Sequence, residues 1–314
     1  MNRVLITGGG GFIGSHLGRA YVRQGSDVTI VARPGSALHR LADLDEHLRV
    51  VRVDLTDTQA VAQMFDDIRP NVVFHLANTT RITPRKDLGD VALTVSENLG
   101  PLLTVLSGAL NCAHPPEVFV RTGSIAEYGT IPPPFGEASR EVPADPYGVS
   151  LLAGTHYLRV MQPKLPFPAI TARLALTYGP DQSGDFLVPS MIEALVSGLP
   201  IDLRRPDDLR DLIHVEDAVD GLMTLAAHAS VAPPLANVST GISTSTADVA
   251  RMIAVYSGAD PALITFGTPV GPPVMLCSDP ALLRTSLGWQ PRVAIADGLQ
   301  RTVAWRQQKN GGQR

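Results

Sequence analysis

A glycine-rich turn near the start of the chain limits the fold more than any other feature. The apolar run RVLIT, residues 3–7, is followed directly by GGGGFIGSHLGRAYV, in which Gly8, Gly11 and Gly14 stand three residues apart. In a strand–turn–helix unit the first glycine permits the tight turn, the second admits a pyrophosphate to the backbone, and the third allows close packing. The start of the helix presents unpaired N–H groups and a positive dipole end to an anion. The pattern predicts a dinucleotide site, with a plain strand–turn–helix corner as the alternative.

Short apolar runs alternate with longer amphipathic stretches through the first part of the chain. Near-continuous apolar strands separated by helices are typical of a parallel sheet that is covered on both faces. We therefore predict an α/β fold, with a Rossmann-type doubly wound parallel sheet and a smaller C-terminal substrate-binding domain. The expected strands are 3–7, 27–32, 48–53, 71–77, 117–122 and 167–175, and the expected helices are 12–24, 57–68, 87–112, 147–162 and 186–198.

The pattern becomes less regular after residue 175, which indicates a change of domain. We expect a dinucleotide-binding domain formed by residues 1–172 and 212–240, and a substrate-binding domain formed by residues 173–211 and 241–314. Within the second domain, TYGPDQSGD and LRRPDDLRD are predicted as loops on either side of the helix at 186–198.

The end of the second predicted strand indicates which dinucleotide binds. An acidic residue there hydrogen-bonds the adenine ribose of NAD, whereas an arginine accommodates the 2′-phosphate of NADP. The chain reads VARPGS at this point, with Ala32 and Arg33 and no carboxylate. We therefore predict NADP(H) as the preferred cofactor and NAD as the alternative. The other interpretation of Arg33 is an exposed surface charge.

Composition and charge argue against several other classes of protein. The net charge is −4 and the basic residues are scattered, so no nucleic-acid surface is expected. No run of about 18 apolar residues is present to cross a membrane. Cys112 and Cys277 fit neither a disulfide framework nor a zinc site, the spacing of the histidines predicts no metal site, and no G-x-S-x-G hydrolase elbow occurs. We expect a cytoplasmic protein whose ligands are small molecules.

Further motifs follow the glycine turn in a fixed order. They are TGGGGFIG, VDLTD (53–57), FHLA (74–77), SIAEYG (124–129), PYGVS (146–150), LTYGPDQ (176–182), RDLIHVED (210–217) and NVSTG (237–241). With these motifs the chain resembles the extended short-chain dehydrogenase/reductase family, and within it the nucleotide-sugar branch of epimerases, dehydratases and 4-ketoreductases. The resemblance covers essentially the whole chain and ends in LGWQPRVAIADGL.

The resemblance implies a role for particular residues. Ser124 and Tyr147 would be the catalytic pair, in which the tyrosine gives a proton to the developing alkoxide and the serine holds the oxygen. The resemblance also implies a nucleotide-sugar substrate and a homodimer formed through helices 87–112 and 147–162. The substrate contacts would be Glu127, Leu187, Val188 and, at the diphosphate, Arg210. The cofactor contacts would be Gly8, Gly11, Phe12, Ile13, Gly14, Arg33, Asp54, Leu55, Leu76, Ala77, Asn78 and Tyr147.

Two positions depart from the family pattern. The family has a lysine four residues after the tyrosine, which lowers the pKa of the phenol from about 10 and binds the nicotinamide ribose, and this chain has Leu151 there. Leu176 stands where members that hold a sugar diphosphate often carry asparagine. Three interpretations of Leu151 are open: Tyr147 still donates a proton in reduction, another cation replaces the lysine, or the protein binds cofactor with little or no turnover. His156 is a poor candidate for that cation because it faces away from Tyr147 on a helix.

The residues after Ser124 favour reduction over dehydration. Sugar 4,6-dehydratases of the family carry an aspartate–glutamate pair there, and this chain has Ile125 and Ala126, which offer no acid or base. Glu127 resembles the residue found in reductases of nucleotide-bound 4-keto-6-deoxysugars. We therefore predict an NADPH-dependent 4-ketoreductase of a nucleotide-linked 4-keto-6-deoxysugar. The alternatives are a nucleotide-sugar 4-epimerase with retained NAD, and a catalytically impaired or non-catalytic NAD(P)-binding protein.

Overall fold

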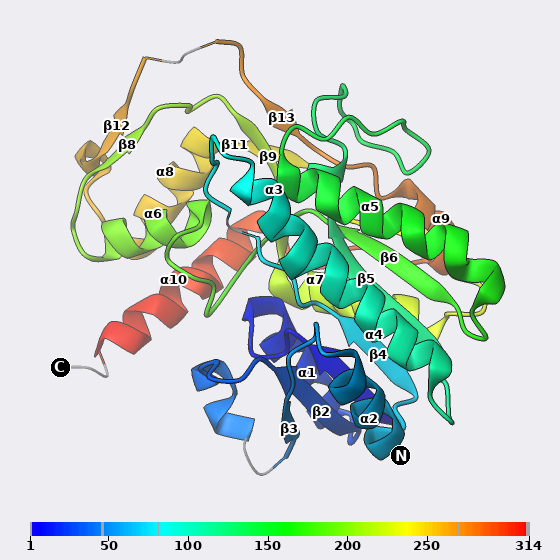
Figure 1. Ribbon diagram of the computed structural model, residues 1–314. Helices are drawn as coiled ribbons and strands as arrows, with labels where there is room; N and C mark the ends of the chain where they lie inside the picture. The colour runs from blue at the N-terminus through cyan, green and yellow to red at the C-terminus, as the bar shows by residue number, and fades with distance from the viewer. Residues whose placement is uncertain (1, 45–46, 81, 269–270, 312–314) are drawn as a thin grey trace.

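The computed structural model describes residues 2–44, 47–80, 82–268 and 271–311, and a seven-stranded parallel sheet forms its centre (Figure 1). The strand order is β10-β6-β5-β4-β1-β2-β3, which contains the doubly wound order expected of a dinucleotide-binding sheet. The predicted α/β class is confirmed. The strands are β1 (Arg3–Thr7), β2 (Asp27–Ala32), β3 (Arg49–Arg52), β4 (Val72–His75), β5 (Val118–Ser124), β6 (Ala169–Leu174) and β10 (Leu235–Val238).

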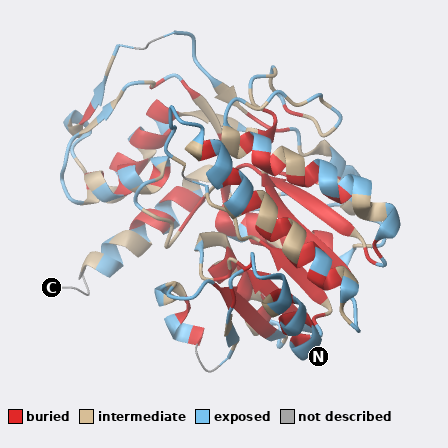
Figure 2. Ribbon diagram, in the orientation of Figure 1, coloured by how far each residue is buried: buried red, intermediate tan, exposed pale blue. Residues whose placement is uncertain are grey.

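Helices cover both faces of this sheet because its strands carry apolar side chains on both sides. Ile6 of β1 belongs to one buried cluster with Leu17, and the adjacent Leu5 belongs to a second cluster with Phe65. Figure 2 shows the strands as a buried layer between partly exposed helices. The first face is covered by α1 (Phe12–Arg23) and α7 (Val215–Ala227), and the second by α2 (Thr58–Ile68), α4 (Gly100–Asn111) and α5 (Pro146–Met161).

The helix predicted over 87–112 is interrupted. It consists of α3 (Gly89–Thr94), the π-helical turn η2 (Val95–Leu99) and α4. Pro101 has no N–H to donate to the carbonyl of Glu97, so the regular α-helical bond cannot form at this point. The wide turn contributes the side chain of Glu97 to an ion pair with Arg33 and that of Asn98 to a 2.7 Å hydrogen bond from the Thr79 N–H.

A smaller part of the chain packs beside the carboxyl edge of the sheet around its own apolar core. The two segments predicted as loops contain strand residues, because β7 and β9 pair with each other over a separation that local sequence cannot reveal. None of the described helices combines the length and apolarity that crossing a bilayer demands. The elements are β7 (Leu176–Tyr178), α6 (Leu187–Val196), β8 (Ile201–Leu203), β9 (Leu209–His214), β11 (Ser243–Ser245), α8 (Thr246–Ser257), β12 (Ile264–Phe266), β13 (Met275–Leu276) and α10 (Ile295–Gly311).

The two expected domains are linked by elements that cross between them. β10 and α7, from the range 212–240, pack with the large sheet as their expected domain requires. However, α9 (Ala281–Leu287) and Trp289, from the range 241–314, also pack against that sheet, since Leu283 and Trp289 belong to its first cluster. The exact division of the chain into two domains stays a prediction.

Candidate functional site

The glycine turn between β1 and α1 forms one wall of a cleft. Gly8 has a φ of +69°, and a side chain there would lie 2.7 Å from the backbone of Leu76 and Ala77. A side chain on Gly14 would overlap the carbonyl oxygen of Gly8. Gly11 precedes α1 without a side-chain cap, so the N–H groups of the first turn remain available to an anion. The geometry fits the pyrophosphate of a dinucleotide.

The cleft has a volume of about 680 Å³, which lies within the usual range of ligand sites. Among its described lining residues only Arg40 and Asp145 are charged. The wall next to the glycine turn is formed by Gly8, Gly11, Phe12, Ile13, Gly14, Arg40, Leu76 and Asn78. The opposite wall, which we call the substrate wall, is formed by Leu174, Ala175, Leu176, Phe186, Leu187, Val188, Leu212 and Leu276.

Ser124 and Tyr147 meet on the floor of this cleft. Ser124 is the last residue of β5, and Tyr147 is the second residue of α5. The helix begins here because Asp145 caps it, accepting a 2.7 Å bond from the N–H of Gly148, and because Pro146 suits the first helical position. A side chain on Gly148 would lie 2.5 Å from the Ala126 carbonyl oxygen. The absence of that side chain lets α5 start directly against the turn after Ser124.

Both side chains line the cleft. Burial raises the pKa of the Tyr147 phenol to about 12, although the Ser124 hydroxyl acts to lower it. A phenol with this pKa keeps its proton at neutral pH. The pair can therefore donate a proton to an oxygen that develops negative charge in the cleft.

Leu151 lies on α5, four residues after Tyr147, and is buried, with 2% of its surface exposed. No cation therefore extends from this point of the helix. The backbone carbonyl of Leu151 instead accepts a 3.0 Å hydrogen bond from Nη1 of Arg121, a buried residue of β5. An arginine inside the apolar run EVFVRT is a visible signal in the sequence, but it did not enter our prediction of the site.

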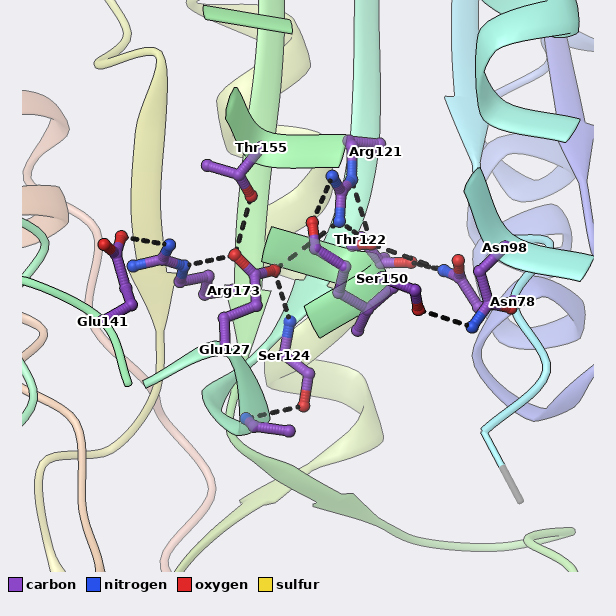
Figure 3. Close-up of polar contacts among 12 residues, drawn as sticks. Asn78, Asn98, Arg121, Thr122, Ser124, Glu127, Glu141, Ser150, Thr155 and Arg173 are labelled. Atoms are coloured by element: carbon purple, nitrogen blue, oxygen red, sulfur yellow. Dashed lines mark hydrogen bonds and ion pairs between the residues drawn. The ribbon is translucent and has the colours of Figure 1, made fainter. Parts of the chain in front are cut away.

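Glu127 does not contact the cleft, contrary to its predicted role as a substrate contact. It is 0% exposed and lies behind Ser124 in a cluster of buried charges (Figure 3). Its Oε2 atom accepts a 2.8 Å bond from Nε of Arg173 and a 2.7 Å bond from the hydroxyl of Thr155. Its Oε1 atom accepts a 3.2 Å bond from the N–H of Ser124. The carboxylate is thus a structural partner of the Ser124 backbone.

Arg33 follows β2 and is 68% exposed at its side chain. Its Nη1 atom lies 3.0 Å from Oε2 of Glu97, and its carbonyl accepts a 3.3 Å bond from Nη1 of Arg52. The guanidinium is thus at the end of the strand where an adenine ribose would lie. Its predicted role toward a 2′-phosphate stays a prediction.

The remaining predicted cofactor residues fall into two groups. Leu76 and Asn78 line the cleft, and Nδ2 of Asn78 donates a 3.2 Å bond to the Thr122 hydroxyl. Ala77 and Leu55 pack instead with the second apolar cluster, and Asp54 accepts bonds from the following turn at Thr56. We keep these assignments as predictions.

Leu187 and Val188 line the substrate wall at the start of α6, and their predicted contact with a substrate stays a prediction. Leu176 also lines it, so the amide that family members carry at this point is replaced by apolar surface. Arg210, the predicted diphosphate ligand, does not line the cleft. Its Nη2 donates a 2.7 Å bond to Asp208 and its Nη1 a 2.8 Å bond to the carbonyl of Val274. To reach a diphosphate it would have to leave these partners.

Arg40 is a cleft residue that we did not predict from the sequence. It lies on the 3₁₀ turn η1 (His39–Leu44), and its Nε donates a 2.9 Å bond to the carbonyl of Asp181. His16 of α1 makes a similar 3.0 Å contact with the carbonyl of Pro180. The loop after β7 is thereby held against the dinucleotide side of the cleft. The segment PGSALHRLADL has no pattern that signals this contact.

Comparisons with known proteins agree with this geometry. The profile of the NAD dependent epimerase/dehydratase family matches residues 4–239. The dTDP-glucose 4,6-dehydratase of Haemophilus influenzae is 26% identical over 333 residues, covering 97% of this chain and 98% of that protein. The UDP-glucose 4-epimerase of Mycolicibacterium smegmatis is 29% identical over 318 residues, covering 98% and 99%. The structure of Thermus thermophilus UDP-glucose 4-epimerase in complex with NAD has a TM-score of 0.82 and 26% identity, covering 97% and 99%.

Proposed function

The chain belongs to the NAD dependent epimerase/dehydratase family, and on that premise we propose that it is an NADPH-dependent reductase of a nucleotide-linked 4-keto-6-deoxysugar. The observation that carries this proposal is that Ser124 and Tyr147 line one cleft together with the glycine turn. Ile125 and Ala126 line the same cleft and offer no group that moves the protons of a dehydration. A reduction needs one proton donor, which the pair provides.

Each part of the cleft would have a separate role in this reduction. The glycine turn and the start of α1 would hold the cofactor phosphates. When bound, the reduced nicotinamide supplies a hydride to the carbonyl carbon. Tyr147 donates its proton to the carbonyl oxygen, and the hydroxyl of Ser124 holds that oxygen in place. The apolar substrate wall excludes water from the reacting carbonyl.

The preference for NADPH is supported by the charges after β2. Arg33 is exposed at the strand end, and Arg52 braces the same loop by donating to the carbonyls of Arg33 and Ser36. A 2′-phosphate placed here would add a second anionic partner for Arg33 beside Glu97. NAD lacks that phosphate, so it would gain less from this arginine.

A nucleotide-sugar 4-epimerase with retained NAD is the second candidate function, and the name of the Mycolicibacterium smegmatis relative favours it. An epimerase requires the tyrosine both to accept and to return a proton. Burial raises the pKa of Tyr147 to about 12, so the phenolate that accepts a proton is scarce at neutral pH. The same argument does not affect net reduction, and the reductase is the better supported of the two.

The third candidate is a non-catalytic or impaired NAD(P)-binding protein, which Leu151 favours because the family lysine also binds the nicotinamide ribose. It predicts cofactor binding without turnover. The substrate experiment below separates this candidate from the reductase, because both bind NADPH and only the reductase transfers hydride from it.

We also propose a homodimer that forms through α3, η2 and α5. These elements contact each other and expose several large apolar side chains to solvent, which is typical of an interface. The residues are Leu88, Val91, Leu93, Val95, Val149, Tyr157 and Val160. Sedimentation of the wild type and of a Val160→Glu variant tests this proposal, since a dimer should become a monomer in the variant.

The function is tested by mass spectrometry of products. Purified protein is mixed with NADPH and a panel of nucleotide-linked 4-keto-6-deoxysugars, and each product is examined for a gain of about two mass units, the two hydrogens of a ketone reduction. Tyr147→Phe should give no such product, whereas the matched control Tyr256→Phe, on α8 and outside the cleft, should behave like the wild type. NADPH binding with no product from any substrate would instead support the non-catalytic candidate.

A further inference from the structure

We propose that Arg121 on β5 supplies the positive charge behind the Tyr147 phenol that α5 lacks at Leu151. Arg121 would be a positioning residue that strengthens the tyrosine as an acid from the protein interior, without touching substrate. The inference rests on the proposed role of Tyr147 as proton donor. On this proposal Arg121, on a strand, lowers the pKa of the phenol, which in the family is done by the helix lysine at the position of Leu151.

The guanidinium of Arg121 is built into the turn of α5 that follows Tyr147. The residue is 1% exposed, and its Nη1 donates a 3.0 Å bond to the carbonyl of Leu151. Gly154, one turn further on, has no side chain, and a Cβ there would overlap Nη1 of Arg121. The helix therefore leaves a space at this point that the arginine fills from the neighbouring strand.

The buried charges are shared unequally between the two arginines of the cluster. Arg173 has two close carboxylates, Glu127 at 2.8 Å and Glu141 at 2.7 Å. Among the described residues, Arg121 has only the shared Glu127, at 3.5 Å from its Nη2. Because its charge is the less neutralised of the two, Arg121 is the cation that can act on other groups nearby.

Tyr147 lies one helical turn before the Leu151 carbonyl that Arg121 contacts. Burial is the main cause that raises the pKa of its phenol, and the carboxylates of Glu127 and Asp145 act in the same direction. The charge of Arg121 acts in the opposite direction and lowers the pKa. Arg121 thus opposes the groups that weaken the phenol as a proton donor.

The cluster also holds the two catalytic side chains together. Glu127 accepts from the N–H of Ser124 and from the hydroxyl of Thr155 on α5, so it joins the strand that carries the serine to the helix that carries the tyrosine (Figure 3). A side chain on Gly123 would overlap Oε1 of Glu127. Three glycines, at 123, 148 and 154, thus make room for one arrangement of charges around the pair.

The first test measures the phenol directly and needs no substrate. The protein is labelled with trifluorotyrosine, whose three ring fluorines lower the pKa of the phenol so that it titrates while the protein is folded. The ¹⁹F signal of Tyr147, identified by its loss in Tyr147→Phe, is titrated in the presence of NADP⁺. Arg121→Met should raise the midpoint by about one pH unit, which is tenfold in proton affinity, and Arg121→Lys should stay near the wild type. Arg159→Met, which removes an exposed cation from the same helix, should have no effect.

The variants should fold, because Glu127 keeps its bond to Arg173 when Arg121 is replaced. Arg121→Gln, which retains a donor for the Leu151 carbonyl, serves in case Arg121→Met does not fold. A midpoint that is unchanged in the folded variants overturns the proposal, whether or not a ketone substrate is known. A shifted midpoint without any turnover would uphold Arg121 and reject the proposed reductase.

The second test is a rescue. With a ketone substrate, Arg121→Met should lower kcat about tenfold with the Kd for NADPH unchanged. Leu151→Lys, which restores the cation at the family position, should recover most of this loss in the Arg121→Met background and gain less in the wild-type background. Equal effects in the two backgrounds would show that the two positions are independent, which contradicts the proposal.

Discussion

Nη1 of Arg33 lies 3.0 Å from Oε2 of Glu97, so the arginine that we assign to a 2′-phosphate already has an anionic partner in the protein. Arg33 comes from the end of β2, and Glu97 comes from the π-helical turn η2. The pair is exposed, which limits its strength to about 1 kcal/mol or less. A phosphate with two charges can therefore compete for the guanidinium.

Replacing Arg33 should reverse the cofactor preference. Hydrogen bonds to charged groups contribute about 1.5–3 kcal/mol, so Arg33→Asp should weaken NADPH binding by about 10- to 150-fold, while the new carboxylate should favour the ribose of NADH. Fluorescence titration with both cofactors gives the two Kd values. Arg49→Asp, at the opposite end of β3 from Arg52, is the matched control and should change neither. Equal affinity of the wild type for NADPH and NADH would remove the assignment of Arg33.

Tyr147→Phe should abolish reduction and leave NADPH binding nearly intact. Loss of a general acid typically costs about 100- to 10,000-fold in rate, and the ring that lines the cleft is retained. Single-turnover oxidation of NADPH, followed by absorbance, measures the rate. A variant that still reduces ketones at the rate of the wild type would show that another group donates the proton.

Leu151→Lys should raise oxidative turnover more than reductive turnover. A cation near the phenol lowers its pKa, and each unit increases the phenolate about tenfold, which assists a tyrosine that must accept a proton. In reduction the phenol already carries its proton, because the wild-type pKa is about 12. Rates in both directions should be compared with His156→Lys, which adds a cation to the exposed side of α5. A larger gain in reduction than in oxidation would contradict this account.

Glu127→Ala should destabilise the fold strongly. Removing one member of a buried ion pair costs about 3–5 kcal/mol, because Arg173 would lose its 2.8 Å partner in the interior. The free energy of unfolding in urea measures the effect. Glu193→Ala breaks a more exposed pair with Arg306 and should cost about 1 kcal/mol or less. Similar losses in the two variants would mean that the buried cluster contributes no more than a surface pair.

Much of the fold could be read from the sequence because its signals are local. The strands RVLIT and DVTIVA have the bounds that were predicted, β1 at Arg3–Thr7 and β2 at Asp27–Ala32. Each is a continuous apolar run next to a turn, which a parallel sheet covered on both faces requires. The prediction of one helix over 87–112 was less accurate. Pro101 lacks the N–H that a regular α-helix needs at this point, and the helix is interrupted by a π-helical turn.

The sequence predicted the site only in part, because a motif identifies a residue and does not show whether its side chain points into the cleft. Ser124, Tyr147 and the glycine turn lie together as the family motifs imply. Glu127 and Arg210 were expected in the cleft, and both are held by charged partners instead. Arg173 lies 46 residues from Glu127, so nothing in the nearby sequence indicates their contact. Asp208 lies only two residues before Arg210, and the acidic residue in DDLRD is a local signal that our prediction did not use.

By itself the sequence determined the strand–turn–helix that holds a dinucleotide, the parallel sheet that follows it, and the loss of a lysine after Tyr147, because each of these depends on residue types at short, fixed spacings. Only the tertiary structure decided which charges surround the phenol. Arg121 meets the Leu151 carbonyl across 30 residues of sequence, and Glu127 meets Arg173 across 46. Such contacts arise when strands and helices are packed, since the energy of a buried charge depends on every group that packing brings within a few ångströms.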